Sequence, residues 1–142
     1  MTPDLQCSAL PERLTETRLE TSPAKTARYA ALTADFNPIH VDPVFARNTP
    51  FGAPINHGTL GLSLLTQSIE MTFGNQPYDL DIRFSRPAPV GSSLIAGGAL
   101  RGADNSYQVN VTTGDGVQVI QGTLHLISPS NNEQGRDLND RD

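Results

Sequence analysis

The chain has 142 residues, 37% of them hydrophobic, and a net charge of −5, which suits a single domain with one core. Residues 129–142 carry four acids against two arginines, which is −2 of that charge, so the rest of the chain is only mildly acidic. This charge balance argues against nucleic-acid or membrane-surface partners, and a single cysteine, Cys7, excludes disulfide frameworks and thiolate metal clusters.

No segment has the pattern of a leader peptide or a membrane span. The first ten residues, MTPDLQCSAL, lack the basic start and apolar run of a signal peptide. No stretch approaches the roughly eighteen apolar residues of a membrane helix. We therefore expect a cytoplasmic protein, with one domain over residues 1–128 and a disordered acidic tail over residues 129–142.

Short elements are predicted in the first third of the chain. Residues 12–21 alternate leucine with threonine and charged residues, a weak strand pattern. A helix is predicted from Pro23, because Ser22 is a good N-cap and alanines follow; it should stop before Pro38. A second short helix is expected directly after Asp42, its predicted cap.

The third predicted helix, residues 58–74, is unusually apolar. Large apolar residues surround it, Glu70 is its one charged residue, and Gly74 is a natural stop. We expect such a helix to be buried on nearly all sides. In a chain of this size, a strongly curved sheet wrapped around the helix would bury it.

Four strand-like segments follow, separated by turn signals rich in proline, asparagine and glycine. They cover residues 78–88, 92–102, 106–116 and 117–128. The third alternates apolar and polar residues strictly, and the fourth shifts its phase at Val119–Ile120, as a β-bulge would require. Helices followed by a run of strands predict an α+β fold with an antiparallel sheet and no second domain.

Chemistry-bearing residues gather around one proline in the stretch DFNPIH. Asp35 and His40 cannot share a helical face because Pro38 intervenes, so we expect a turn that pivots on Asn37–Pro38. Such a turn can direct a carboxylate and an imidazole to one point, which is the minimal set for activating water near neutral pH. Taken alone, the pattern also fits an ordinary turn with a structural histidine.

Gly58 opens the apolar helix, where unpaired backbone N–H groups and the positive end of the helix dipole point outward. A glycine there lets a ligand approach the backbone, so its N–H could hold a developing oxyanion. A plain glycine at a helix start is the alternative. We expect His57, directly before it, to be a hydrogen-bonding residue rather than a catalyst. No metal is expected, because no ligand pair has helical spacing. No nucleotide cofactor is expected either, because the stretch GGALRG is not followed by Lys-Ser/Thr.

Residues 29–66 resemble the signature of the MaoC-like, (R)-specific enoyl-CoA hydratases. That family's pattern runs Tyr-Ala, Ser/Thr-x-Asp-x-Asn-Pro-Ile/Leu-His, an aromatic-Ala pair and His-Gly. This chain supplies Tyr29–Ala30, Thr33, Asp35, Asn37, Pro38, Ile39, His40, Phe45–Ala46 and His57–Gly58.

The resemblance implies a hot-dog fold, in which a curved antiparallel sheet wraps one long apolar helix, usually paired as a homodimer and alternatively as a heterodimer. It implies syn addition of water to a trans-2-enoyl-CoA, giving a (3R)-3-hydroxyacyl-CoA without a cofactor. Asp35 and His40 would activate the water, and the Gly58 N–H would polarise the thioester carbonyl. Thr66, eight residues further on, would position the aspartate or the water.

Two positions depart from the family pattern. Asn56 and Thr59 are more polar than the aliphatic residue and the Met or Leu usual there, which leaves the acyl preference open. The residues expected to contact substrate are Asn37, Asn56, His57, Arg83 and Arg86, with the arginines facing an anionic CoA or carrier protein. Two other functions stay open: a (3R)-3-hydroxyacyl-carrier-protein dehydratase, and a non-catalytic acyl-CoA-binding subunit. An intact Asp35/His40 pair speaks against the second.

Overall fold

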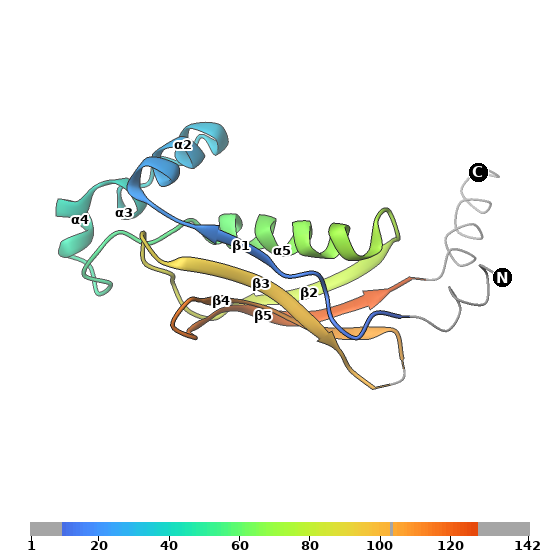
Figure 1. Ribbon diagram of the computed structural model, residues 1–142. Coiled ribbons are helices and arrows are strands. Elements are labelled where there is room, and N and C mark those ends of the chain that lie inside the picture. The colour runs from blue at the N-terminus through green and yellow to red at the C-terminus, as the bar shows by residue number, and fades with distance from the viewer. Residues whose placement is uncertain (1–9, 103, 128–142) are drawn as a thin grey trace, which may run out of the picture.

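The computed structural model describes residues 10–102 and 104–127. A five-stranded antiparallel sheet, in the order β1-β3-β4-β5-β2, curves around one long helix, α5 (Figure 1). The helices are α2 (Pro23–Thr33), α3 (Pro38–Val41), α4 (Pro43–Arg47) and α5 (Gly58–Phe73). The strands are β1 (Thr17–Glu20), β2 (Tyr78–Phe84), β3 (Ser93–Leu100), β4 (Ser106–Thr113) and β5 (Gln118–Leu126). The predicted α+β fold is confirmed, and the tail predicted at residues 129–142 lies outside the described residues.

Helix α5 is buried on one face only, so the expectation of burial on nearly all sides is wrong within this chain. The face against the sheet consists of Gly61, Leu64, Leu65, Ser68 and Ile69. The opposite side exposes Thr59, Ser63, Gln67, Glu70 and Met71. Most of these are polar residues that recur every three or four positions, which places them on one stripe of a helix with 3.6 residues per turn. The expectation rested on the number of apolar residues in the helix, and a number does not show that the polar residues lie on one side.

The core lies between α5 and the inner face of the sheet. On β4 the predicted alternation is confirmed, because Tyr107, Val109 and Val111 are fully buried while the residues between them are not. The predicted bulge is confirmed as well. Val111 pairs with Ile120 and the next residue of β4 pairs with Gln118, so Val119 has no partner across the strands.

Helices α2, α3 and α4 lie beyond one end of the sheet, next to the start of α5 (Figure 1). Helix α2 begins as predicted, because the Ser22 side chain accepts a hydrogen bond from the Lys25 N–H. The turn predicted at Asn37–Pro38 is closed as a single helical turn, α3. Its cap is the Asn37 side chain, which accepts from the Ile39 N–H at 3.1 Å. None of the helices in the described residues is long and apolar enough to cross a membrane.

Candidate active site

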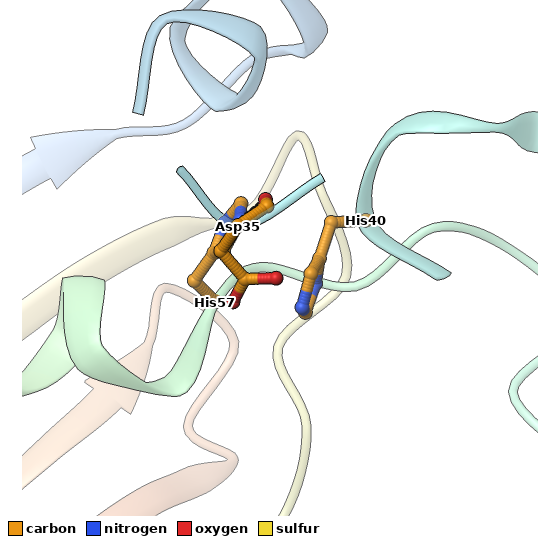
Figure 2. Close-up of side chains that lie close together, drawn as sticks. All are labelled: Asp35, His40 and His57. Atoms are coloured by element: carbon orange, nitrogen blue, oxygen red, sulfur yellow. Dashed lines mark hydrogen bonds between the residues drawn. The ribbon is translucent and has the colours of Figure 1, made fainter. Parts of the chain in front are cut away.

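Three side chains from separate segments meet beside the start of α5: Asp35, His40 and His57 (Figure 2). Asp35 lies in the loop after α2, His40 in α3, and His57 is the N-cap residue of α5. Their carboxylate and ring-nitrogen atoms lie within 4.8 Å of one another. Figure 2 shows the Asp35 carboxylate directed toward the His40 ring. The fold therefore brings together the two residues that the sequence proposes as a pair, and adds a third.

The His40 ring has one nitrogen held and one free to exchange a proton. Its Nδ1 lies 2.8 Å from the Ile55 carbonyl oxygen. Because a carbonyl can only accept, Nδ1 carries the hydrogen, which leaves Nε2 as the nitrogen available for proton transfer. The Ile55 N–H in turn donates to the Ile39 carbonyl at 3.1 Å. These two hydrogen bonds fix α3 to the segment that precedes α5.

His57 contacts both members of the pair. It is 3% exposed, and its Nε2–H donates to the Asp35 backbone carbonyl at 3.0 Å. Its ring stacks on His40, with the ring centroids 3.9 Å apart and the planes inclined by 23°. The Tyr29 ring meets it edge-on at 5.0 Å. His57 thus ties the backbone of Asp35 and the ring of His40 to one buried group.

The stacked rings favour proton transfer over metal chelation. The lone pair of an imidazole lies in the ring plane, so two nearly parallel rings direct their lone pairs side by side. A tetrahedral zinc ion needs them to converge on one point. The expectation that no metal belongs here stays a prediction, and this geometry supports it.

A cavity of about 300 Å³ opens next to His40. It is lined by His40, Ile55, Asn56, His57, Gly58, Gly61, Phe84, Ser85, Arg86, Pro87, Ala88, Leu94 and Val119. Gly58, Phe84 and Arg86 are exposed and lie at its mouth, whereas Asn56, His57, Ala88, Leu94 and Val119 are buried. The exposed lining therefore includes one cation, Arg86, and the buried lining combines two polar residues with three apolar ones.

Gly58 is the first residue of α5, so its N–H has no acceptor inside the helix. It is not among the glycines with positive φ, so its backbone does not require glycine. A Cβ at this position would lie 3.2 Å from the Phe84 ring. The absence of a side chain thus keeps this backbone donor open to the mouth of the cavity.

Asn56 uses its side chain within the protein. Its amide nitrogen donates to the Thr21 hydroxyl and to the carbonyls of Ala88 and Pro89, at 3.1 to 3.3 Å. Its amide oxygen accepts from the Thr26 hydroxyl at 3.4 Å. Asn56 lines the cavity, but these contacts join the residue after β1, helix α2 and the loop before β3. Its predicted contact with substrate stays a prediction.

Replacing Asn56 with leucine, an aliphatic residue of the kind usual in the family, should lower the stability of this protein. Leucine fills a similar volume but leaves the buried Thr26 hydroxyl without its partner, while the Thr21 hydroxyl and the carbonyls of Ala88 and Pro89 each lose one of their hydrogen bonds. Leaving a buried polar group unsatisfied typically costs about 1–3 kcal/mol. We expect a lower melting temperature and a lower urea midpoint for Asn56→Leu. Asn56→Gln is the control, because glutamine keeps the polar amide group but is one methylene longer. Equal stability of the leucine variant and the unchanged protein would contradict this account.

The other predicted site residues are placed as follows. Asn37 caps α3 and its N–H donates to the Asp35 carboxylate at 3.3 Å. The Thr66 hydroxyl donates to the Ser63 carbonyl at 2.9 Å within α5, and Thr66 does not line the cavity. Arg86 lies at the mouth, whereas Arg83 lies with Gln108 and Gln121 on the opposite face of the sheet. The structure thus brings Asn37 and Arg86 to the site and leaves Thr66 and Arg83 apart from it.

Three residues of the site that were not expected from the sequence are Ile55, Val119 and Leu94. Ile55 acts through its backbone carbonyl, which side-chain patterns do not reveal. Val119 lines the cavity because of the bulge, and the phase shift in the sequence was the available signal for it. Leu94 gave no signal beyond being a strand residue.

A curved sheet around one helix, with an aspartate and a histidine beside the start of that helix, defines a hot-dog domain of the hydratase and dehydratase type. The chain belongs to the MaoC-like domain family, whose sequence profile matches residues 9–121.

Relatives with known names agree with this assignment. The chain is 54% identical over 76 residues to an (R)-specific enoyl-CoA hydratase of Aeromonas caviae, covering 51% of this chain and 57% of that protein. It is 34% identical over 104 residues to a mitochondrial 3-hydroxyacyl-[acyl-carrier-protein] dehydratase of Arabidopsis thaliana, covering 70% of this chain and 62% of that protein. Each match therefore spans less than two thirds of the relative.

A solved structure shows the same fold. The (R)-hydratase from A. caviae involved in PHA biosynthesis superposes with a TM-score of 0.67 at 29% identity. The alignment covers 84% of this chain and 98% of that one. The hot-dog fold expected from the resemblance is confirmed.

Proposed function

We propose that this protein catalyses the reversible syn hydration of trans-2-enoyl-CoA thioesters to (3R)-3-hydroxyacyl-CoA. The observation that carries the proposal is the approach of the Asp35 carboxylate to the His40 imidazole beside a cavity that Gly58 also lines. A base, an acid and a free backbone donor are what addition of water to an unsaturated thioester requires. The relatives named as hydratase and dehydratase support the same chemistry.

In the proposed reaction one water is held between Asp35 and His40. The Asp35/His40 pair takes one proton from the water as the water oxygen bonds to C3, and the C2–C3 π electrons move toward the thioester carbonyl, whose oxygen gains negative charge. The Gly58 N–H stabilises that oxygen at the positive end of α5. When the enolate collapses, the pair returns the proton to C2. Because one water supplies both the hydroxyl and the proton from one side, addition is syn.

The remaining site residues have supporting roles in this proposal. Asn37 holds the turn that carries Asp35 and His40. Arg86 lines the cavity as an exposed cation, and in this proposal it meets the phosphates of CoA. Arg83 has no part in it, because that side chain lies on the other face of the sheet. Thr66 keeps a lesser role, since its hydroxyl bonds to its own helix.

Dehydration of a (3R)-3-hydroxyacyl-carrier-protein is the second candidate function. The same groups catalyse both directions, and the A. thaliana relative is named for this reaction. The exposed Arg86 can meet the phosphate of a carrier-protein arm as well as that of CoA. A non-catalytic acyl-CoA-binding subunit is less consistent with the site, because such a subunit has no use for an assembled Asp35/His40 pair.

We further propose that the protein works as a homodimer in the cytoplasm. The helices beyond the sheet expose a group of large apolar side chains that a second copy could cover. They are Leu32, Phe36, Val41, Val44, Phe45 and Phe51. The molar mass in solution, measured by light scattering, tests this proposal.

One assay separates the candidates. Loss of the enoyl absorbance is followed with purified protein, using trans-2-enoyl thioesters of CoA and of a carrier protein over a range of chain lengths. Asp35→Asn serves as the control. Faster turnover of CoA thioesters supports the hydratase, and faster turnover of carrier thioesters supports the dehydratase. If no thioester is hydrated above the level of the Asp35→Asn control, the proposed function is wrong.

From the contacts of His57 we predict how the substitution His57→Phe changes kcat. Phenylalanine keeps an aromatic ring against His40 and Tyr29 but cannot donate to the Asp35 carbonyl. It also removes Nδ1, a buried nitrogen without a hydrogen-bond partner in the described structure. Losing one net hydrogen bond costs about 0.5–1.5 kcal/mol, so we expect kcat to fall about two- to tenfold with the melting temperature nearly unchanged.

Steady-state kinetics and thermal melting of one His57→Phe preparation check this expectation. His57→Leu is the control that also removes the stacked ring, and it should lower kcat further. Unchanged kcat in both folded variants would show that the contacts of His57 do not position the pair.

A further inference from the structure

The bulge in β5 turns two neighbouring side chains to the same side of the sheet. In an unbroken strand, successive side chains point to opposite faces. Val119 and Ile120 are nevertheless both buried, at 6% and 0% exposure, and both belong to the core beneath α5. The extra residue in the register allows this, since β-bulges re-aim side chains in this way.

The side chains of Val119 and Ile120 have different surroundings. Ile120 packs against α5, where a Cβ at Gly61 would lie 3.2 Å from its Cδ1. Ile120 does not line the cavity, whereas Val119 does. The Val119 carbonyl accepts from the Ser85 N–H at 2.8 Å, which holds the bulge at the end of β2. Val119 is therefore a fixed part of the cavity wall.

Val119 belongs to the buried part of the cavity lining. The buried lining residues are Asn56, His57, Gly61, Ala88, Leu94 and Val119, and the apolar side chains among them are those of Ala88, Leu94 and Val119. A thioester whose carbonyl reaches the Gly58 N–H would place its acyl tail against these apolar side chains. At about 300 Å³ the cavity is at the lower limit of ligand pockets, which run from about 300 to 1,000 Å³.

We propose that Val119, together with Leu94, limits the room for the acyl tail in this cavity and restricts this protein to short-chain enoyl thioesters. The proposal rests on the hydratase function proposed above and names the substrate class of that site. The volume left beside these side chains then determines which chain length is still accepted. One methylene in an apolar pocket changes kcat/KM by about 10- to 200-fold, so a single side chain here has a measurable effect.

The test compares kcat/KM over a series of trans-2-enoyl-CoA substrates of increasing chain length. For Val119→Ala we expect kcat/KM to rise about tenfold or more for the first chain length that the unchanged protein rejects, with little change for the shortest substrate. For Val119→Leu we expect a fall of about tenfold for the longest accepted chain. Val111→Ala is the matched control, because Val111 is equally buried in the core but does not line the cavity.

Binding of saturated acyl-CoA thioesters, measured by calorimetry, tests the cavity without catalysis. The length preference should shift to longer chains in Val119→Ala and stay unchanged in Val111→Ala. A protein that binds these thioesters with this pattern but hydrates no enoyl-CoA would refute the proposed function and keep the acyl-binding inference. Identical length profiles in the unchanged protein and both Val119 variants, by kinetics or by binding, would overturn the inference.

Discussion

Asp35→Asn is expected to lower kcat by about 10²- to 10⁴-fold, the usual contribution of a general acid or base. The Asp35 side chain is exposed, and within the described part of the chain its one hydrogen bond is accepted from the Asn37 N–H at 3.3 Å. Asparagine keeps an oxygen at that position, so the turn and the fold should remain intact. The substitution therefore removes the ability to take a proton and little else.

His40→Gln should lower kcat to a similar extent, because the Nε2 atom that exchanges the proton is lost. The double variant should be little worse than either single one, since residues that act as a unit are not additive. Asp42→Asn is the matched control: Asp42 is an exposed carboxylate that caps α4, and asparagine is an equally good cap. Turnover near that of the unchanged protein in folded Asp35→Asn would end the proposed mechanism.

Gly58→Ala should lower kcat/KM by about 10²-fold or more, the scale seen when an oxyanion donor is lost. The N–H itself remains, but the new methyl group stands where the thioester would approach it. Stability should stay level or rise slightly, because alanine is the better helix former by about 1 kcal/mol and the φ of Gly58 is not positive. The contact at 3.2 Å with Phe84 is the opposing effect, and that ring is 54% exposed and has room to move.

Melting temperature and steady-state kinetics on one Gly58→Ala preparation separate the functional effect from the structural one. Phe84→Leu in the same background gives the methyl group more room. If activity returns in the double variant, the loss came from the displaced ring. A stable Gly58→Ala protein with normal kinetics would refute the oxyanion role of Gly58 while leaving the Asp35/His40 pair in place.

Local chemistry made most of the fold predictable. The Ser22 cap, the Asp42 cap and the stop at Gly74 each depend on one or two residues, and each is found where expected. The bulge was visible because it broke a strict alternation in the sequence. Helix α3 was missed because a four-residue helix has no periodicity, and only its closing hydrogen bonds distinguish it from a turn.

The site was predictable only in part, because it depends on contacts between distant segments. Proximity of Asp35 and His40 follows from one short turn. The stacking of His57 on His40 joins residues 17 positions apart, and no local pattern encodes it. Whether an arginine reaches the site depends on which face of the sheet its side chain occupies. Arg83 and Phe84 are neighbours on β2, yet only Phe84 faces the cavity.

The segment that runs from Asp35 through α3 and α4 is held to the rest of the chain in a way that affects how it can move. Helices α3 and α4 pack mainly on each other and on α2, outside the layer formed by α5 and the sheet. A few hydrogen bonds hold the segment to the rest, among them those from His57 to Asp35 and from His40 to Ile55. Segments with so few anchors open by local unfolding at a lower free energy than a core strand such as β4. Asp35 and His40 can therefore come apart and reassemble while the sheet stays folded, so mild heating or denaturant would abolish the proposed activity before the protein unfolds.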